Sequence, residues 1–143
     1  YACGPQDIIG GMTKIHQYSM LSAPTMGQFA AIEALRNGSD AVKEMTAEYR
    51  RRRNFLVSEL NRIGLKCPMP DGAFYLFPSI RKTGKKSLDF AQSLLRKEKV
   101  AVVPGVAFGP SGEGYVRLSY ATALEQLREA VRRMERFVKR AGR

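Results

Sequence analysis

Apolar residues recur every three or four positions through most of the first 63 residues, which is the spacing of amphipathic helices. The pattern predicts three helices, over residues 5–18, 24–37 and 39–63. Pro5 and Pro24 suit a first helical turn, where a backbone N–H has no intrahelical acceptor. Gly38 and Gly64 follow the last periodic residues of the second and third helices, as expected of C-terminal caps.

Short apolar and β-branched runs replace the helical spacing after residue 64. They predict strands over residues 65–67, 73–77, 100–103 and 115–120, separated by turn-forming sequences such as Pro104-Gly105. One helix is predicted to begin at Ser87, and another to run from Thr122 to Val138. The second half of the chain therefore has the pattern of an α/β domain.

The helix predicted over residues 39–63 is longer than a small domain requires. At about 1.5 Å per residue it would extend on the order of 37 Å. We therefore expect it to connect two separate parts of the fold.

Composition and cysteine usage narrow the class of protein. Of 143 residues, 44% are hydrophobic and 26% charged, which is typical of a folded domain and not of a disordered chain. Cys3 and Cys67 lie far apart without a CxxC pair, so we expect neither a bound metal nor a disulfide framework. No apolar run approaches the roughly 18 residues of a membrane span. We expect a cytoplasmic protein without a membrane partner. Because the chain begins at Tyr1 and not at a methionine, we also expect a preceding segment.

The chain is strongly basic, with 24 Lys and Arg against 13 Asp and Glu and a formal net charge of +11. Such a balance raises nucleic-acid binding as an alternative function. Four consecutive arginines, residues 50–53, would point in directions about 100° apart on a helix, and the aromatic residues are not interleaved with them. Nucleic-acid binding is therefore not favoured. The other basic candidates are Arg128, Arg132, Arg133, Arg136, Lys139, Arg140 and Arg143.

Arg117 is the most informative single residue. In a strand over residues 115–120, the apolar even-numbered residues share one face and the odd-numbered residues, Arg117 among them, share the other. Arg117 then lies either on an ordinary solvated sheet face or at a site where its planar guanidinium binds a carboxylate through two parallel hydrogen bonds. The pattern alone leaves both interpretations open.

Two other features carry little weight. The glycine-rich residues 105–114 lack the Gly-Lys-Ser/Thr ending of a phosphate-binding loop and lead into a strand, which favours a connecting loop. His16 has no second histidine at metal-ligand spacing, which favours an ordinary surface histidine.

Several segments in a fixed order resemble the C-terminal part of class I/II aminotransferases, which depend on pyridoxal phosphate. The resemblance covers essentially the whole chain and is closest to the prokaryotic aspartate and aromatic aminotransferases. The segments are Tyr1-Ala2-Cys3-Gly4-Pro5, Ser22-Ala23-Pro24-Thr25 with Gln28-Phe29-Ala30-Ala31, Pro70-Asp71-Gly72-Ala73-Phe74-Tyr75, Val102-Val103-Pro104-Gly105-Val106-Ala107-Phe108-Gly109 and Gly114-Tyr115-Val116-Arg117-Leu118-Ser119-Tyr120-Ala121.

The resemblance implies the α/β fold type I of these enzymes. Residues 1–38 would be the C-terminal remnant of the large domain that binds pyridoxal phosphate. Residues 39–63 would be the long inter-domain helix, and residues 64–143 the small C-terminal α/β domain that closes over the substrate. The resemblance also implies a homodimer, with residues 19–25 near the subunit interface.

The resemblance further implies that Arg117 binds the substrate α-carboxylate and that Gly72, Ala73, Phe74 and Tyr75 belong to the wall that closes over the substrate. The Schiff-base lysine and the arginine for the cofactor phosphate are expected upstream of Tyr1. No catalytic residue is therefore expected in this chain, and Lys14 does not take that role. The chain alone should be inactive and should not hold pyridoxal phosphate covalently.

The reaction that the resemblance implies is transamination between an amino acid and a 2-oxo acid. Other fold type I enzymes that use the same cofactor, such as a carbon–sulfur lyase or a synthase, would share most of these motifs. Product analysis separates those alternatives from an aminotransferase.

Overall fold

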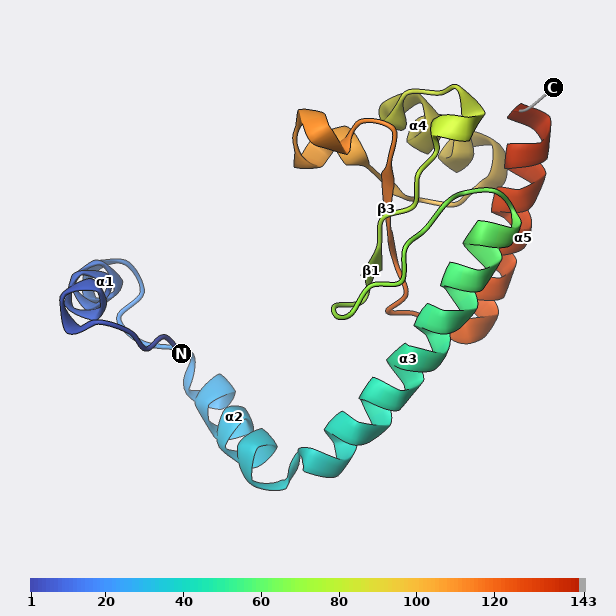
Figure 1. The fold of residues 1–143 in the computed structure, drawn as a ribbon. Coiled ribbons are helices and arrows are strands. Elements are labelled where there is room, and N and C mark those ends of the chain that lie inside the picture. The colour runs from blue at the N-terminus through green and yellow to red at the C-terminus, as the bar shows by residue number, and fades with distance from the viewer. Residues whose placement is uncertain (142–143) are drawn as a thin grey trace. The chain divides into compact units, whose positions relative to one another are not determined.

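The computed structural model describes residues 1–141 of the chain (Figure 1). Its contacts divide the chain into two compact units, Tyr1–Glu44 and Met45–Arg143. The boundary falls inside helix α3 (Ser39–Arg62), which follows the helix predicted over residues 39–63 closely. The assignment of residues 1–38, 39–63 and 64–143 to two domains and a connecting helix stays a prediction.

The first unit consists of α1 (Gln6–Ser19), α2 (Thr25–Asn37) and the beginning of α3. Both helices begin one residue after the prolines that were expected to open them. Neither α1 nor α2 has a buried residue in this structure, although both carry apolar side chains at helical spacing. Ile8, Met12 and Phe29, for example, are exposed.

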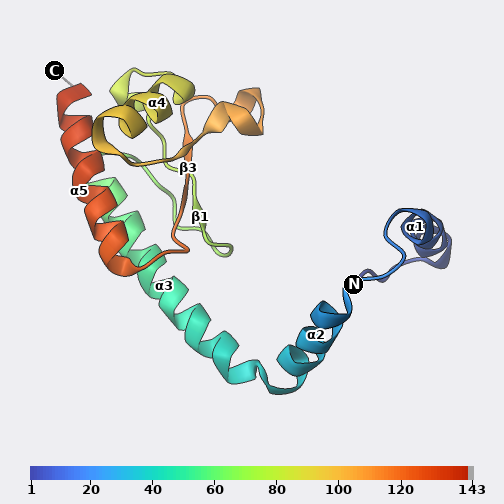
Figure 2. The ribbon, with the colours of Figure 1, turned by 180° about the vertical axis from the view of Figure 1, so that it is seen from behind.

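The second unit surrounds a small antiparallel sheet with the order β1-β3-β2. The strands are β1 (Tyr75–Leu76), β2 (Val103–Pro104) and β3 (Val116–Ser119), and the helices are α4 (Ser87–Glu98) and α5 (Leu124–Ala141). Three short 3₁₀ segments complete the unit: η1 (Arg81–Thr83), η2 (Gly105–Phe108) and η3 (Pro110–Gly112). Seen from two sides, α5 runs beside the C-terminal part of α3, and β3 lies next to β1 (Figures 1 and 2).

The core of this unit lies where α3, α4 and α5 meet one face of the sheet. α5 contributes side chains three or four residues apart, as its apolar spacing predicts. β3 contributes every second residue, because alternate side chains of a strand point to opposite faces. The buried residues include Leu56, Leu60, Leu76, Phe90, Leu94, Val116, Tyr120, Leu127, Val131, Met134 and Phe137.

The predicted strand over residues 65–67 is wrong, because these residues form no strand although Leu65 and Cys67 are buried. The side chain of Asn61 takes the place of a strand partner. Its Oδ1 accepts the backbone N–H of Cys67 at 3.0 Å, and its Nδ2 donates to the carbonyl of Cys67 at 2.9 Å. The apolar side chains are therefore buried by packing. The backbone N–H and carbonyl of Cys67 make their hydrogen bonds to a side chain and need no neighbouring strand.

The strands predicted over residues 73–77 and 115–120 exist but are shorter. The strand predicted over residues 100–103 is shifted: β2 contains only Val103 of it, together with Pro104, which was expected in a turn. Ala73 has a φ of 61°, outside the extended region, so β1 cannot extend back to it. The register of β2 and β3 pairs Val103 with Arg117 and would place Ala101 opposite Ser119. Those two residues instead line a cavity, so β2 does not extend back to residue 100.

Most basic residues of α5 have acceptors within the protein. Glu98, at the end of α4, has a side chain that is 5% exposed and lies 3.0 Å from Arg136 and 3.3 Å from Arg140. Arg133 donates to the backbone carbonyl of Glu98 at 3.2 Å. These contacts fasten the end of α4 to α5. Arg143, another basic residue of the tail, lies outside the described residues.

Three arginines of the run in α3 also have acceptors within the protein. Arg51 and Arg52 both bind Glu48, at 2.8 and 2.7 Å, and Arg53 donates to the carbonyl of Pro70 at 3.0 Å. The run therefore does not form one uniform cationic surface, and the expectation against nucleic-acid binding stays a prediction.

Candidate functional site

Arg117 lies in the middle of β3, on the face of the sheet that points away from the core. Its neighbour Val116 is fully buried, and Tyr120 is 1% exposed, whereas Arg117 itself is half-buried. The alternation expected from the sequence is thus present. It places a guanidinium on the open face of a sheet whose other face is packed.

Two aromatic rings hold the guanidinium. Its Cζ atom lies 4.4 Å from the centroid of the Tyr75 ring and 4.7 Å from that of Phe108. Tyr75 comes from β1, where its partner in the register is Ser119, two residues from Arg117. Phe108 is the last residue of η2. Both contacts are within the range of cation–π attraction.

Further rings continue this surface, which we call the aromatic face: Tyr75, Phe77, Phe108 and Tyr115 around Arg117. The Phe77 ring stacks on Tyr115 with centroids 5.6 Å apart and meets Phe108 edge-on at 5.8 Å. The packed rings limit the positions that Arg117 can adopt, since each ring is itself held by a neighbour.

The N–H groups of the Arg117 guanidinium have no acceptor among the described residues, because neither a hydrogen bond nor an ion pair of this side chain occurs there. Aromatic rings attract the cation but do not use its planar fork of donors. That fork matches the two oxygens of a carboxylate. The arrangement can therefore bind an anionic carboxylate from outside the chain.

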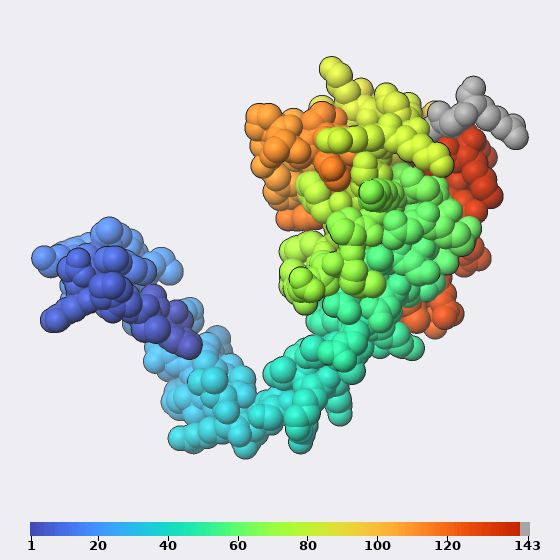
Figure 3. Space-filling view, viewed as in Figure 1, coloured from blue at the N-terminus to red at the C-terminus, as the bar shows by residue number. Residues whose placement is uncertain are grey.

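Of the predicted wall residues, Gly72, Ala73 and Phe74 lie in the turn before β1, at the surface of the second unit (Figure 3), and Tyr75 is the first residue of β1. The Phe74 ring is 4.5 Å from the ring of Tyr75, which in turn contacts Arg117. Phe74 is therefore linked to the guanidinium through the Tyr75 ring, which contacts both. An atom added at the Cβ position of Gly72 would meet nothing within 4 Å, so this backbone borders open space.

Ala73 helps to hold the turn in place through its backbone carbonyl. Its carbonyl accepts a hydrogen bond of 2.6 Å from the hydroxyl of Tyr120, which follows β3. The ring of Tyr120 is buried, and burial raises the pKa of its hydroxyl. The turn is thus fastened to the same strand that carries Arg117. Of the predicted site residues, the structure places Phe74 next to Tyr75 and leaves Gly72 and Ala73 in the adjoining turn.

Phe108 is a site residue that the sequence did not single out, and Tyr75 was expected only as part of the wall, not as a contact of Arg117. Both belong to motifs that carry the family resemblance. Tyr75 precedes a buried residue in an alternating strand, which places it on the face opposite the core. That signal was available for Tyr75. Phe108 offers no such signal, because its place depends on how residues 105–114 fold.

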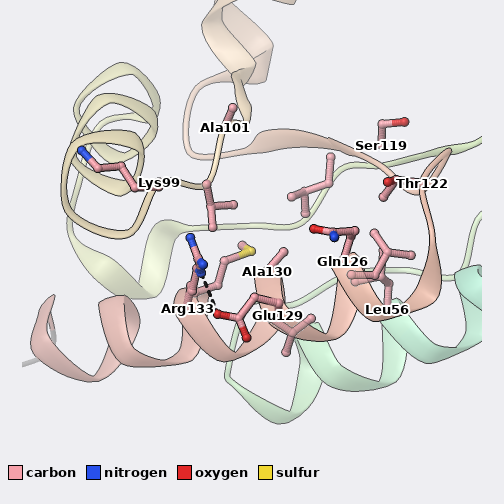
Figure 4. Close-up of a pocket in the computed structure, with 14 residues that line it drawn as sticks. Leu56, Lys99, Ala101, Ser119, Thr122, Gln126, Glu129, Ala130 and Arg133 are labelled. Carbon is pink, nitrogen blue, oxygen red and sulfur yellow. Dashed lines mark hydrogen bonds and ion pairs between the residues drawn. The ribbon is translucent and has the colours of Figure 1, made fainter.

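A cavity of about 330 Å³ opens elsewhere, between α5, the end of β3 and residues 99–101 (Figure 4). Apolar residues such as Leu118 and Ala130 line it, together with Lys99 and Arg133. The Arg133 guanidinium is bound to Glu129 at 2.8 Å, as the dashed line in Figure 4 marks. Arg117 is not among the lining residues. The candidate site is therefore the open aromatic face and not this cavity.

No helix in the part of the chain that the structure describes has the length and apolar character needed to span a membrane.

The family assignment follows from comparison with known proteins. The family model of aminotransferase class I and II matches residues 1–134. The chain therefore belongs to the class I and II aminotransferases, a family that depends on pyridoxal phosphate.

Individual relatives agree with this assignment. The chain is 58% identical over 138 residues to the putative aminotransferase YugH of Bacillus subtilis, covering 96% of this chain and 36% of that protein. It is 45% identical over 141 residues to aromatic-amino-acid aminotransferase 2 of Thermococcus litoralis, covering 97% and 36%. The chain thus spans about 36% of the length of these relatives.

Solved structures show the same fold. The crystal structure of the aromatic aminotransferase from Pyrococcus horikoshii OT3 matches with a TM-score of 0.91 at 48% identity, over 96% of this chain and 37% of that one. The aspartate aminotransferase from Thermus thermophilus with maleate matches with a TM-score of 0.84 at 42% identity, over 94% and 35%. The predicted fold class is confirmed: the chain matches a C-terminal portion of fold type I aminotransferases.

The described residues in contact with Arg117 do not by themselves fit pyridoxal phosphate. They supply aromatic rings and no amine. The aldehyde of the cofactor requires an amine to bind covalently, and its phosphate requires several donors. The groups present fit a carboxylate instead.

Proposed function

We propose that the protein carrying this chain is a pyridoxal-phosphate-dependent aminotransferase that transfers an amino group between an amino acid and a 2-oxo acid. In this proposal Arg117 binds the α-carboxylate that both substrates share. Membership of the family supports the reaction class. The residues of this chain contribute substrate recognition and no step of the cofactor's own chemistry.

One observation carries the role of Arg117. Its guanidinium is held between Tyr75 and Phe108 on an open face, while its donors have no acceptor within the described residues. An arginine on an ordinary solvated face would not need two rings within 5 Å.

We propose further that Phe74 lies beside the bound substrate, with Gly72 and Ala73 forming the adjoining edge of the site. The contact from Phe74 through Tyr75 to Arg117 supports this placement. Apolar rings beside the ion pair exclude water, and the attraction between the guanidinium and the carboxylate is stronger where water is excluded. A carboxylate held at both oxygens also fixes the direction of the bonds at the α-carbon.

The remaining parts of the proposal concern the whole protein. We propose a cytoplasmic homodimer in which residues outside this chain hold pyridoxal phosphate. Residues 1–38 would complete the large cofactor-binding domain, residues 39–63 would connect the domains, and residues 64–143 would form the small domain. The match to a C-terminal portion of two aminotransferase structures supports this arrangement.

Replacing Arg117 with lysine in the full-length protein tests the proposal. Lysine keeps the positive charge but loses the planar pair of donors. We expect kcat/KM for the preferred amino acid to fall at least about tenfold, since a hydrogen bond to a charged group contributes about 1.5 kcal/mol or more. Steady-state kinetics measure this.

The matched control is Arg96→Lys, at an exposed position on α4. It should leave kcat/KM unchanged. If Arg117→Lys is as active as this control, Arg117 does not bind the substrate carboxylate.

A further inference from the structure

Glu113, just before β3, caps helix α4 from a distant part of the chain. Its Oε1 accepts the backbone N–H of Ser87 at 2.7 Å and that of Gly114 at 3.0 Å, and its Oε2 accepts the Ser87 hydroxyl at 2.9 Å. Ser87 is the first residue of α4 and is fully buried. The hydrogen bonds from Ser87, followed by that from Gly114, lower the pKa of Glu113. The ionised carboxylate of Glu113 therefore holds Ser87, which lies 26 positions earlier in the chain.

The capping contact reaches η2 through Ser87. The backbone N–H of Val106 donates to the Ser87 hydroxyl oxygen at 3.4 Å. Val106 belongs to η2, the segment that ends with Phe108. Glu113 is thus connected, through the Ser87 hydroxyl and Val106, to the 3₁₀ segment that ends with Phe108.

Residues 105–114 also have little freedom to move internally. The backbones of Gly105 and Gly112 touch: a Cβ on Gly105 would lie 2.0 Å from the Gly112 carbonyl oxygen, and one on Gly112 would lie 2.1 Å from that of Gly105. Tyr115 binds both 3₁₀ segments of the loop, because its carbonyl accepts from the N–H of Gly105 at 2.9 Å and its N–H donates to the carbonyl of Gly112 at 3.2 Å. A displacement at Glu113 is therefore transmitted to Phe108.

We propose that Glu113 is a positioning residue for Arg117: by fastening residues 105–114 to the start of α4, it keeps the Phe108 ring against the Arg117 guanidinium. We call the contacts of Glu113 with Ser87, and of Ser87 with Val106, the latch. This inference rests on the proposed function of Arg117. Glu113 touches no substrate itself and acts only through the loop.

The test must separate positioning from a simple contribution to stability. For this purpose, kcat/KM is measured for the preferred amino acid and for its α-carboxamide, which is uncharged and has an amide nitrogen in place of one carboxylate oxygen. The ratio of the two values reports how well the enzyme recognises the carboxylate. A smaller fraction of folded enzyme lowers both values equally and leaves the ratio unchanged.

Four variants of the full-length protein are compared: Glu113→Gln, Ser87→Ala, Arg117→Ala and the double variant Glu113→Gln/Arg117→Ala. Glutamine cannot accept all three hydrogen bonds, because its amide nitrogen is a donor. Glu113→Gln should lower the ratio about threefold or more, as expected when a ring contact of the guanidinium is weakened. Ser87→Ala removes the hydroxyl that links Glu113 to Val106, so it should lower the ratio as well. The matched control is Glu125→Gln, at an exposed position in the first turn of α5.

The double variant tests whether Glu113 acts through Arg117. Arg117→Ala should abolish most of the preference for the carboxylate, and adding Glu113→Gln should then change the ratio no further. Additive losses would mean that Glu113 acts independently of Arg117, which overturns the inference.

The other outcomes distinguish this inference from the function on which it rests. An unchanged ratio in Arg117→Ala would contradict the proposed role of Arg117, whatever Glu113→Gln does. A lowered ratio in Arg117→Ala together with an unchanged ratio in Glu113→Gln would overturn only the latch. If Glu113→Gln does not fold, the ratio in Ser87→Ala decides: a ratio like that of Glu125→Gln rejects the latch.

Discussion

The position of Arg117 follows from the alternation of its strand, whereas its contacts do not. A period of two is enough to place Arg117 on the face opposite Val116, and the structure has it there. The two rings that hold it come from Tyr75, 42 positions earlier, and from Phe108 in a 3₁₀ turn. Such contacts depend on how distant segments pack, and no local pattern in the sequence encodes them.

The ring of Phe108 should matter to substrate affinity even though it donates no hydrogen bond to a carboxylate. Replacing it with leucine keeps an apolar side chain but removes the cation–π contact, which is worth about 0.5–1 kcal/mol at a partly exposed site. We expect KM for the amino acid to rise about two- to fivefold, and Phe108→Tyr, which keeps the ring, to restore it. Equal KM values for the leucine and tyrosine variants would show that the ring contact has no role.

The helices were predicted well because each of them carries its own signal. The apolar spacing of α5 and the prolines before α1 and α2 are local features, and the observed ends lie within a few residues of those expected. The strands were predicted less well. A strand needs a partner, and Asn61 supplied the hydrogen bonds of Cys67 in place of one. A side chain that replaces a strand cannot be foreseen from the hydrophobic pattern.

The contact between α3 and α5 should depend on pH. Arg62 of α3 binds Glu135 of α5 at 3.0 Å, and Lys139 binds Glu135 at 2.9 Å. The hydrogen bonds from Arg62, and then from Lys139, lower the pKa of Glu135 from 4.5 to about 2. A carboxyl group whose pKa is lowered by folding stabilises the folded state above its unfolded pKa, and this contribution is lost as the pH falls through the folded value.

Glu135→Gln should therefore weaken the protection of α5 amides against hydrogen exchange at pH 6, and the difference from the parent protein should shrink as the pH falls from about 4.5 to 2. Comparing both proteins at the same pH cancels the intrinsic exchange rate. Equal protection at pH 6, or a difference that persists unchanged at pH 2, would mean that this ion pair does not fasten α5 to α3.

The two units of the chain differ in how far they bury their apolar side chains. The second unit has a continuous core, from Leu56 to Phe137. In the first unit, Ile8 is 56% exposed, Met12 49% and Phe29 69%. Amphipathic helices of this kind ordinarily bury their apolar face against another element. The sequence predicts the helices of the first unit, but what covers them is not encoded in their own spacing.

Expressed alone, the 143-residue chain should self-associate through these exposed side chains. Sedimentation velocity should show a sedimentation coefficient that rises with concentration, and the triple variant Ile8→Ser/Met12→Gln/Phe29→Ser should reduce the rise. A single monomeric species at high concentration would show that the exposed side chains drive no association.

The most direct test of the carboxylate site is a crystal structure of the full-length protein with a bound carboxylate analogue of its substrate. Both oxygens of the carboxylate should lie about 2.7–2.9 Å from the guanidinium nitrogens of Arg117, with Tyr75 and Phe108 still against that guanidinium. A carboxylate bound by another cationic residue, with Arg117 left without a ligand, would contradict the role given to Arg117.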